Sequence, residues 1–412
     1  MKKIYAEVAG TSVRGYVSSK FQAVADAFID NFSQRDELGA SCCVRVGEEI
    51  VVDLWGGYTS IDKILPWQEN TTSVVFSCTK AMTALCAHLL VERGQLNLNE
   101  PVATYWPEFA QNGKDQITVE MILNHSSALP AFRQPIKPNG FNDWEYMVKR
   151  VEQEQPFWEP GTRNGYHMIS FGWTVGELVR RVSGLSLGQF FAQEFAQPLQ
   201  ADFWIGLPDD KASRVAPVAM NRTDDSLPMS DFMLEIVNDA ESIPHLALLN
   251  SGGHNANSEA ALRAEIGGAG GVSNARSMSK LFSPLANNGV AAGKRYFSNK
   301  AITKMSAVST ATMLDATLLV PTRFGLGFMK AIDNRLCKPG NTDSFIIGDR
   351  AFGHVGAGGS TVFADPDNQM SFSYTMNLMG PGILLNDRGQ ALIDAAYLSL
   401  GYKDNSSGCW SI

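Results

Sequence analysis

The sequence of 412 residues lacks an excess of basic charge, long hydrophobic runs and any clustering of cysteine. Its net charge is −8 and no basic run offsets that balance, so the electrostatic footprint of a nucleic-acid-binding protein is missing. The first residues carry positive charge, but no apolar core follows as in a secretion signal, and no later segment is apolar over the length of a membrane span. These absences predict a cytoplasmic protein with no nucleic-acid or membrane partner.

The six cysteines are scattered, without the spacing of a metal site. They predict free thiols in a reducing compartment. No cluster of His, Cys, Asp or Glu predicts a metal, and nothing in the sequence predicts a cofactor. The chain also lacks internal repeats and low-complexity linkers. Its length is enough for two or three domain-sized units, and its 44% hydrophobic content is enough for a large core.

The spacing of apolar residues predicts an antiparallel sheet built from both ends of the chain, with helices between. A helix is expected over residues 21–32, followed by a hairpin with strands at 41–46 and 50–55. Further helices are expected at 77–94, 118–123, 141–152, 171–183, 187–197 and 389–400, and further strands at 324–331, 351–354, 360–363 and 370–376. We therefore expect an α/β fold: a sheet domain of residues 1–75 and 265–412, a mostly helical inserted domain of residues 76–264, and an active site between them.

A serine and a lysine three residues apart stand at the start of the first inserted helix. Ser77 and Lys80 share a helix face. The residues around them are apolar on nearly every side, and burial lowers the pKa of a lysine, so Lys80 is a candidate to accept the Ser77 proton. The spacing alone arises about once by chance in a chain of this length. A second copy, Ser277 and Lys280, falls on the polar side of an apolar stripe, which predicts an ordinary solvated helix face.

Three further stretches give the first copy its context. Residues 117–130 lie between the Ser77–Lys80 pair and Tyr166, residues 160–167 place Tyr166 in a loop before a helix, and residues 353–360 form a glycine-rich strand. In this order, they resemble the serine β-lactamase and penicillin-binding-protein superfamily, especially the family VIII carboxylesterases related to class C β-lactamases. The likeness covers nearly the whole chain and implies a β-lactamase/transpeptidase-like fold.

The resemblance also implies roles for the matching residues. Ser77 matches the nucleophile, Lys80 the activating base and Tyr166 the proton shuttle. The backbone N–H groups of Ser77 and Ala357 would form the oxyanion hole, where each donor is worth about 2.7–4 kcal/mol.

Two departures from the family pattern concern the substrate. Met168 stands where β-lactamases carry an asparagine, and His354 stands in place of the lysine of the K-T-G motif, whose glycine matches Gly356. The missing amide and cation would hold a lactam's side chain and carboxylate. We therefore expect a serine esterase that cleaves small-molecule esters through a Ser77 acyl-enzyme, with His354, Gly356, His167 and Met168 as pocket candidates.

Other activities of the same fold stay open from the sequence. They are a β-lactamase, a D-amino-acid peptidase or amidase, an acyltransferase, and a non-catalytic penicillin-binding-like module. The sequence also leaves open whether the protein is a monomer or a homo-oligomer, and which acyl-chain length it accepts.

A competing motif surrounds Ser186, which lies in a G-x-S-x-G pattern typical of α/β-hydrolases. That pattern requires a strand before the serine. Here a helix ending near Gly184 precedes it, so Ser186 is expected to be the N-cap of the next helix. Among the remaining candidates, we expect His88 to be structural, His125 to make local hydrogen bonds and Cys78 to be a packed apolar residue.

Overall fold

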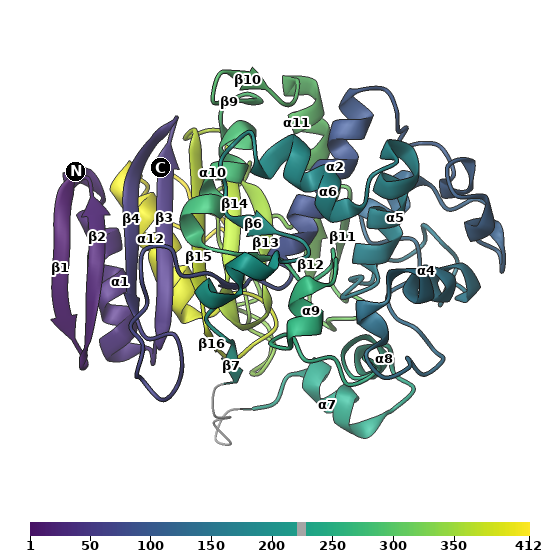
Figure 1. Ribbon diagram of the computed structural model, residues 1–412, viewed down its shortest axis with the longest axis horizontal. Helices are drawn as coiled ribbons and strands as arrows, with labels where there is room; N and C mark the ends of the chain where they lie inside the picture. The colour runs from purple at the N-terminus through teal and green to yellow at the C-terminus, as the bar shows by residue number, and fades with distance from the viewer. Residues whose placement is uncertain (221–227) are drawn as a thin grey trace.

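The computed structural model describes residues 1–220 and 228–412. A seven-stranded antiparallel sheet fills one side of the molecule, and most of the helices pack on the other (Figure 1). The strand order is β1-β2-β4-β3-β15-β14-β13. These strands are β1 (Lys2–Val8), β2 (Thr11–Val17), β3 (Gly39–Val46), β4 (Glu49–Gly57), β13 (Phe352–Val355), β14 (Thr361–Asp365) and β15 (Met370–Met376).

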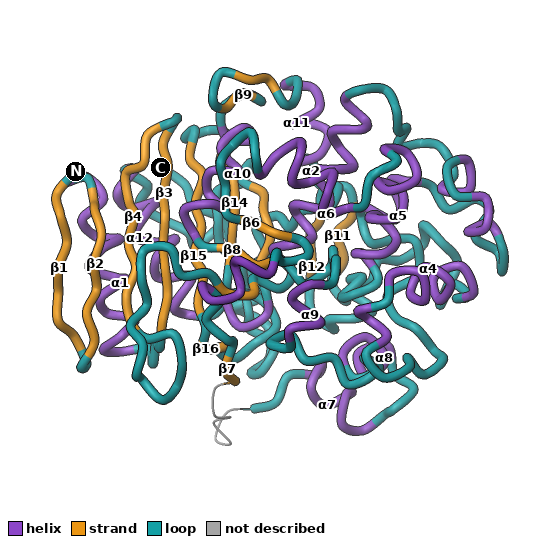
Figure 2. The backbone as a smooth tube through the Cα atoms, viewed as in Figure 1, coloured by secondary structure: helices purple, strands orange, loops and turns teal. Residues whose placement is uncertain are grey.

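The two ends of the chain meet in the middle of this sheet, where β3 pairs with β15 and Val44 lies opposite Phe372. Figure 2 shows these strands side by side. The predicted hairpin is confirmed as β3 and β4, which turn at Gly47 with a positive φ of 61°. The fold class predicted from the sequence, an antiparallel sheet built from both chain ends, is therefore confirmed.

Helices cover both faces of the sheet. Helices α1 (Gln22–Gln34) and α12 (Asp387–Leu400) pack against each other, and α10 (Ala275–Ala286) packs on β3, β14 and β15. In β14, Phe363 belongs to the core that contains α1 and α12, whereas its neighbours Val362 and Ala364 belong to the core that contains α10. Successive side chains of a strand point to opposite faces, so α10 and the α1/α12 pair lie on opposite faces of the sheet.

The remaining helices are formed by residues that follow β4 and precede β13 in the sequence. They are α2 (Cys78–Glu92), α3 (Val119–Leu123), α4 (Trp144–Gln153), α5 (Phe171–Ser183), α6 (Leu187–Phe191), α7 (Asp231–Asn238), α8 (Ile243–Leu248), α9 (Glu259–Arg263) and α11 (Asn299–Ser306). Helix α2 is buried without interruption from Cys78 to Leu90, as its apolar sequence predicts. The domain limits predicted at residues 75/76 and 264/265 stay a prediction.

Short strands complete the structure. Three of them form a small sheet in the order β5-β8-β6, namely β5 (Ser73–Val74), β6 (Phe203–Trp204) and β8 (Val272–Ser273). The others pair two by two as β7 (Ala219–Met220) with β16 (Leu378–Met379), β9 (Val290–Ala291) with β10 (Lys294–Arg295), and β11 (Thr310–Thr312) with β12 (Thr322–Phe324).

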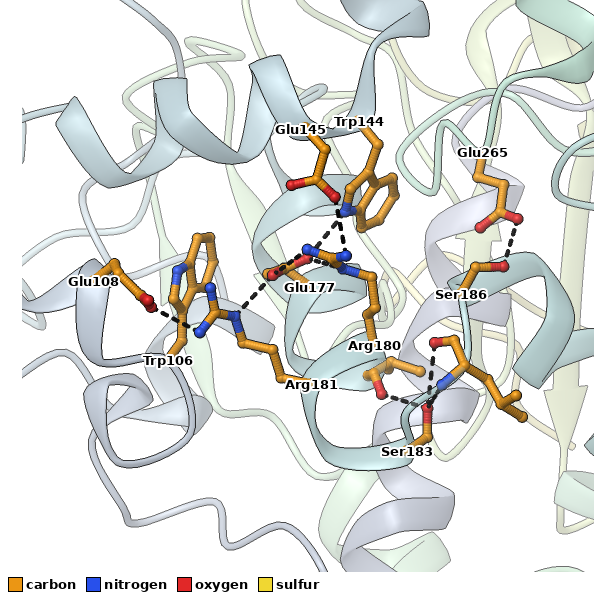
Figure 3. Close-up of polar contacts among 12 residues, drawn as sticks. Trp106, Glu108, Trp144, Glu145, Glu177, Arg180, Arg181, Ser183, Ser186 and Glu265 are labelled. Carbon is orange, nitrogen blue, oxygen red and sulfur yellow. Dashed lines mark hydrogen bonds and ion pairs between the residues drawn. The ribbon is translucent and has the colours of Figure 1, made fainter.

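A buried carboxylate ties α4 to α5. Glu177 accepts hydrogen bonds from Trp144 Nε1 at 2.9 Å, Arg180 Nε at 2.7 Å and Arg181 Nε at 2.7 Å (Figure 3). Its side chain has no exposed surface, so these donors replace its lost hydration. The cluster holds the N-terminal end of α4 against the helix that follows Tyr166.

Several predictions of elements were wrong in detail. The hairpin β1/β2 is absent from the predicted elements, because its turn at Ala9 and Gly10 lacks the usual hairpin pattern. The strand predicted over 324–331 ends at Phe324, because the chain turns where Gly325 N donates to Phe328 O at 2.8 Å. The helix predicted over 187–197 ends at Phe191 and continues as a π-helical turn, Ala192–Ala196.

The prediction of a solvated face for the second serine–lysine pair was also wrong. Ser277 is buried and Lys280 is half-buried, because α10 packs on the sheet. The Ser277 hydroxyl accepts a hydrogen bond from Asp202 N at 2.9 Å. This hydrogen bond joins α10 to the segment directly before β6.

Across the described residues, no helix combines the length and the apolar character needed to cross a bilayer.

Candidate active site

The turn before α2 presents Ser77 from a strained backbone. Phe76 has a φ of 44°, in the left-handed region, where a bulky side chain costs about 1–3 kcal/mol. The turn is held from both sides: β5 pairs with β8, and Thr79 Oγ1 accepts from Gly271 N at 2.8 Å. Ser77 is the N-cap of α2 and is half-buried, and its hydroxyl makes no capping hydrogen bond, so the helix does not occupy it.

Lys80 reaches the Ser77 hydroxyl, as the spacing predicts. Its Nζ lies 3.0 Å from Ser77 Oγ, 2.6 Å from Met168 O and 2.7 Å from Gly268 O. The side chain is fully buried, and burial holds the pKa of Lys80 well below its usual range. A neutral amine has two N–H donors and one lone pair. The two carbonyls take the donors, which leaves the lone pair for the Ser77 proton.

Tyr166 completes the group. Its ring centroid lies 4.8 Å from Lys80 Nζ, and its ring stacks on Phe324 at 5.8 Å with an interplanar angle of 6°. Burial raises the pKa of Tyr166, and a hydrogen bond with the Ser77 side chain opposes part of that shift. The tyrosine is therefore a neutral phenol whose hydroxyl lies beside the Ser77 side chain and whose ring lies beside Lys80.

A buried aspartate, which the sequence did not predict, holds the Tyr166 loop. Asp315 accepts hydrogen bonds from the backbone N–H of Tyr166 at 3.0 Å and from Asn164 Nδ2 at 3.1 Å. It also accepts from the backbone N–H groups of Thr317 and Leu318 and from the Thr322 hydroxyl. Burial raises the pKa of Asp315, and these donors oppose the rise. The available signal was a lone acidic residue in the otherwise uncharged stretch 308–322.

Three fully buried histidines surround the Tyr166 ring or its neighbour. The His125 ring lies 5.1 Å from the rings of Tyr166 and His167, and His354 lies 6.0 Å from Tyr166. Burial lowers the pKa of His167 and of His354 to about 3, and it lowers that of His125 well below its usual range. All three are neutral at physiological pH. They line this side of the site without adding charge beside Lys80.

These histidines make local hydrogen bonds. His125 Nδ1 accepts from His167 N at 3.2 Å, as expected for a local role, and His354 Nδ1 lies 2.7 Å from Val355 O. His354 therefore provides no cation at the position that matches the lysine of the K-T-G motif. His88 lies farther along α2 and bonds Leu326 O at 2.8 Å, in the structural role expected for it.

The glycine-rich end of β13 packs against the serine turn. A Cβ on Gly356 would lie 2.3 Å from Val75 O, so only glycine allows this approach. Cys78 Sγ lies 3.6 Å from His354 O on the same contact, and it is buried, as expected for a packed thiol. Ala357, next in the chain, is exposed. The predicted oxyanion donors, the amides of Ser77 and Ala357, thus belong to two segments that pack together.

Met168 contributes through its backbone. Its carbonyl accepts from Lys80 Nζ, while its half-buried side chain packs against the core that contains α1 and α12. Gly268 supplies the second carbonyl from a segment 188 residues away in the chain. Neither carbonyl could be identified from the motif pattern.

The competing serine is a helix cap. Ser186 Oγ accepts from Gln189 N at 3.3 Å. It donates to Glu265 Oε1 at 2.6 Å (Figure 3). Helix α5 precedes it and ends at Gly184, which has a φ of 76°. The prediction that Ser186 caps α6 is confirmed.

Metal ligands are not grouped in this site. Within residues 1–220 and 228–412, no three or more His, Cys, Asp or Glu side chains are placed to hold a metal ion.

Comparison with known proteins identifies the family. The profile of the Beta-lactamase family matches residues 24–396. The chain belongs to the Beta-lactamase family. The esterase/beta-lactamase LipL of Mycobacterium tuberculosis is 32% identical over 396 residues, which cover 92% of this chain and 87% of LipL.

Solved structures agree. A family VIII carboxylesterase is 36% identical, covers 94% of this chain and 99% of its own, and superposes with a TM-score of 0.81. A penicillin-binding protein homologue from Caulobacter crescentus is 32% identical, with coverage of 94% and 99% and a TM-score of 0.83. The resemblance and the β-lactamase/transpeptidase-like fold predicted from the sequence are confirmed, and the chain is a hydrolase of the Beta-lactamase family.

Proposed function

We propose that this hydrolase is a carboxylesterase that cleaves small-molecule esters through an acyl-enzyme on Ser77. The observation that carries the proposal is the environment of Lys80, a buried amine whose donors are taken by two carbonyls and whose third contact is the Ser77 hydroxyl. A serine hydroxyl becomes an effective nucleophile when a neighbouring base removes its proton. Two similar proteins named as esterases, LipL and the family VIII carboxylesterase, support the same reaction class.

The proposed reaction has two steps. In acylation, Ser77 Oγ attacks the ester carbonyl carbon while its proton passes to Lys80, and the amides of Ser77 and Ala357 hold the developing oxyanion. Tyr166 relays the proton to the leaving alkoxide, so the alcohol departs neutral and the acyl group stays on Ser77. In deacylation, water attacks that acyl group, the Ser77 oxygen regains its proton through the same relay, and the carboxylic acid is released.

A second candidate is β-lactam hydrolysis, because the name of LipL includes both activities. The buried neutral His354 weighs against it in this chain. It provides no cation for a lactam carboxylate, and losing one charge-assisted contact costs about 1.5–3 kcal/mol.

Labelling with a fluorophosphonate and peptide mass spectrometry tests the nucleophile. The adduct is expected on the peptide that contains Ser77 and Cys78. Adducts on the Ser186 or Ser277 peptide would contradict the assignment, and no labelling of folded protein would favour a non-catalytic module. Turnover of a chain-length series of nitrophenyl esters, compared with a chromogenic cephalosporin, tests the substrate. Equal or higher kcat/KM on the cephalosporin would identify a β-lactamase instead.

A further inference from the structure

The outer edge of β1 is the open end of the large sheet. β1 is the last strand in the order and pairs with β2 alone among the described strands. Figure 1 shows it at the extreme left of the molecule, with no element beyond it. An edge strand exposes a row of backbone N–H and C=O groups that can pair with another strand.

The sequence of β1 is complementary to itself in one antiparallel register. If two copies pair about a two-fold axis through Tyr5, Lys3 lies opposite the partner subunit's Glu7, and Ile4 lies opposite the partner subunit's Ala6. Because the axis repeats every contact, two Lys–Glu pairs form at once. Opposite charges that face each other across strands are stabilising, and like charges are destabilising.

The two faces of β1 fit this register. Lys3, Tyr5 and Glu7 are exposed on one face. On the other face Ile4 is buried, Ala6 and Val8 are half-buried, and Lys2 is exposed at the end of the strand. Pairing in any register that differs by one residue would place charged side chains against the apolar face. The two-fold register instead keeps Ile4 and Ala6 of both copies on the side covered by α1. The exposed Lys2, at the start of each strand, then lies opposite the partner subunit's Val8.

The exposed face also offers contact area. Tyr5 is 63% exposed and Tyr16 is 41% exposed, and both line a groove with Arg14 and Trp55. The groove has a volume of about 360 Å³. A second β1 in the two-fold register would bring the partner subunit's Tyr5 to the rim of this groove.

We propose that β1 is a homodimerisation edge, through which two copies of this chain form one continuous antiparallel sheet. Lysines on an edge strand commonly discourage pairing. In β1 the acidic Glu7 stands where the two-fold axis places the partner subunit's Lys3, so the same lysine that repels other strands favours a second copy of this one.

Charge reversal on these exposed residues tests the proposal without disturbing the core. The monomer–dimer equilibrium of the full chain is measured by sedimentation equilibrium at low salt. Lys3→Glu and Glu7→Lys should each weaken the dimer by about tenfold or more, because each change creates two like-charge pairs. The double variant K3E/E7K restores both pairs with exchanged sign and should return to within about threefold of the unmodified protein.

A matched control keeps the charge change and moves it elsewhere. Lys300 lies in α11 and is exposed. Lys300→Glu should therefore leave the dimer dissociation constant unchanged. A protein that stays monomeric at concentrations on the order of 0.1 mM would overturn the proposal. So would a dimer that neither single reversal weakens, or one that the double variant fails to restore.

Discussion

Two serine–lysine pairs with the same spacing lie in this chain, and their burial is reversed. In α2, Ser77 is half-buried and reachable while Lys80 is fully buried among carbonyl acceptors. In α10, Ser277 is buried and its hydroxyl accepts from Asp202 N, while Lys280 is half-buried. The first arrangement combines an open hydroxyl with a neutral amine. In the second arrangement the hydroxyl is buried and hydrogen-bonded to the backbone, and the amine is partly exposed to water. The serine–lysine spacing therefore favours nucleophilic chemistry only when the lysine is buried and the serine is not.

Removing the two hydroxyls should give the largest difference in kcat between the two serine–lysine pairs. Ser77→Ala should lower kcat on esters by at least about 10⁴-fold, since no covalent intermediate can form. Ser277→Ala should leave kcat unchanged and lower the free energy of unfolding by about 1–3 kcal/mol, because Asp202 N loses a buried acceptor. Initial rates and urea unfolding measure the two effects. A large loss of kcat in the folded Ser277 variant would mean that the second pair takes part in the reaction.

Removing the two amines should give the next largest difference. Lys80→Met should lower the acylation rate by about 10²–10⁴-fold, the usual contribution of a general base. Lys280→Met should change it by less than about twofold, because the amine that contacts the Ser77 hydroxyl is that of Lys80, whereas Lys280 lies on α10. Stopped-flow release of nitrophenol measures acylation directly. Near-normal acylation in folded Lys80→Met would remove Lys80 from the mechanism.

The pH dependence sharpens the same contrast. Burial lowers the folded pKa of Lys80, so kcat/KM should rise tenfold per pH unit below that pKa and level off above it, short of the usual lysine value of about 10.4. His167 and His354 have pKa values lowered to about 3 and should not contribute above pH 5. The free energy of unfolding should also rise with pH in this range. The unfolded chain binds a proton that folded Lys80 does not, so the cost of burying Lys80 falls as pH rises toward about 10.4.

That cost can be measured by difference. The gain in unfolding free energy from Lys80→Met should be larger at pH 7 than at pH 9. A gain that does not change with pH would show that Lys80 stays protonated in the folded protein.

Asp315 tests how far positioning matters beyond the serine–lysine pair. Asp315→Asn keeps one carbonyl oxygen but loses the second acceptor, so the Tyr166 loop should loosen. We expect kcat to fall by about tenfold with a smaller change in KM, and the unfolding free energy to fall by about 1–3 kcal/mol. Asn164→Ala is the matched control, because it removes one donor to Asp315 and leaves the bond to the Tyr166 amide. An unchanged kcat in Asp315→Asn would limit this residue to stability.

The sequence predicted the local parts of the site and missed the distant ones. Ser77 and Lys80 are three residues apart, so helix geometry alone brings them together. Tyr166 came only from the resemblance, since nothing in its own loop points toward Ser77. The carbonyl of Gly268 and the carboxylate of Asp315 reach the site from 188 and 149 residues away in the chain. A carbonyl has no sequence signature, and Asp315 is identifiable only by the contacts that bury it.

The fold shows the same division. The elements with a clear period, such as α5 and β15, were predicted with their observed limits, Phe171–Ser183 and Met370–Met376. The hairpin β1/β2 was missed, because its turn at Ala9 and Gly10 lacks the Asn-Gly pattern typical of tight hairpins. Solvation of α10 was predicted from its own sequence. The sheet that covers it comes from both ends of the chain.

The smallest expected effect on kcat belongs to a third serine, which lies in neither serine–lysine pair. Ser186 has a motif but no buried amine beside it, and its hydroxyl is used as a helix cap, since it donates to Glu265 and accepts from Gln189 N. Ser186→Ala should lower the unfolding free energy by about 0.5–2 kcal/mol through loss of the cap and leave kcat within about twofold. Ser186→Asp, which keeps a capping acceptor but faces Glu265, should recover less stability than Ser186→Asn, because two carboxylates would then meet. Thermal unfolding of the three variants beside Ser277→Ala measures this. Loss of activity in Ser186→Asn with stability retained would give Ser186 a role in the reaction that its hydrogen bonds do not support.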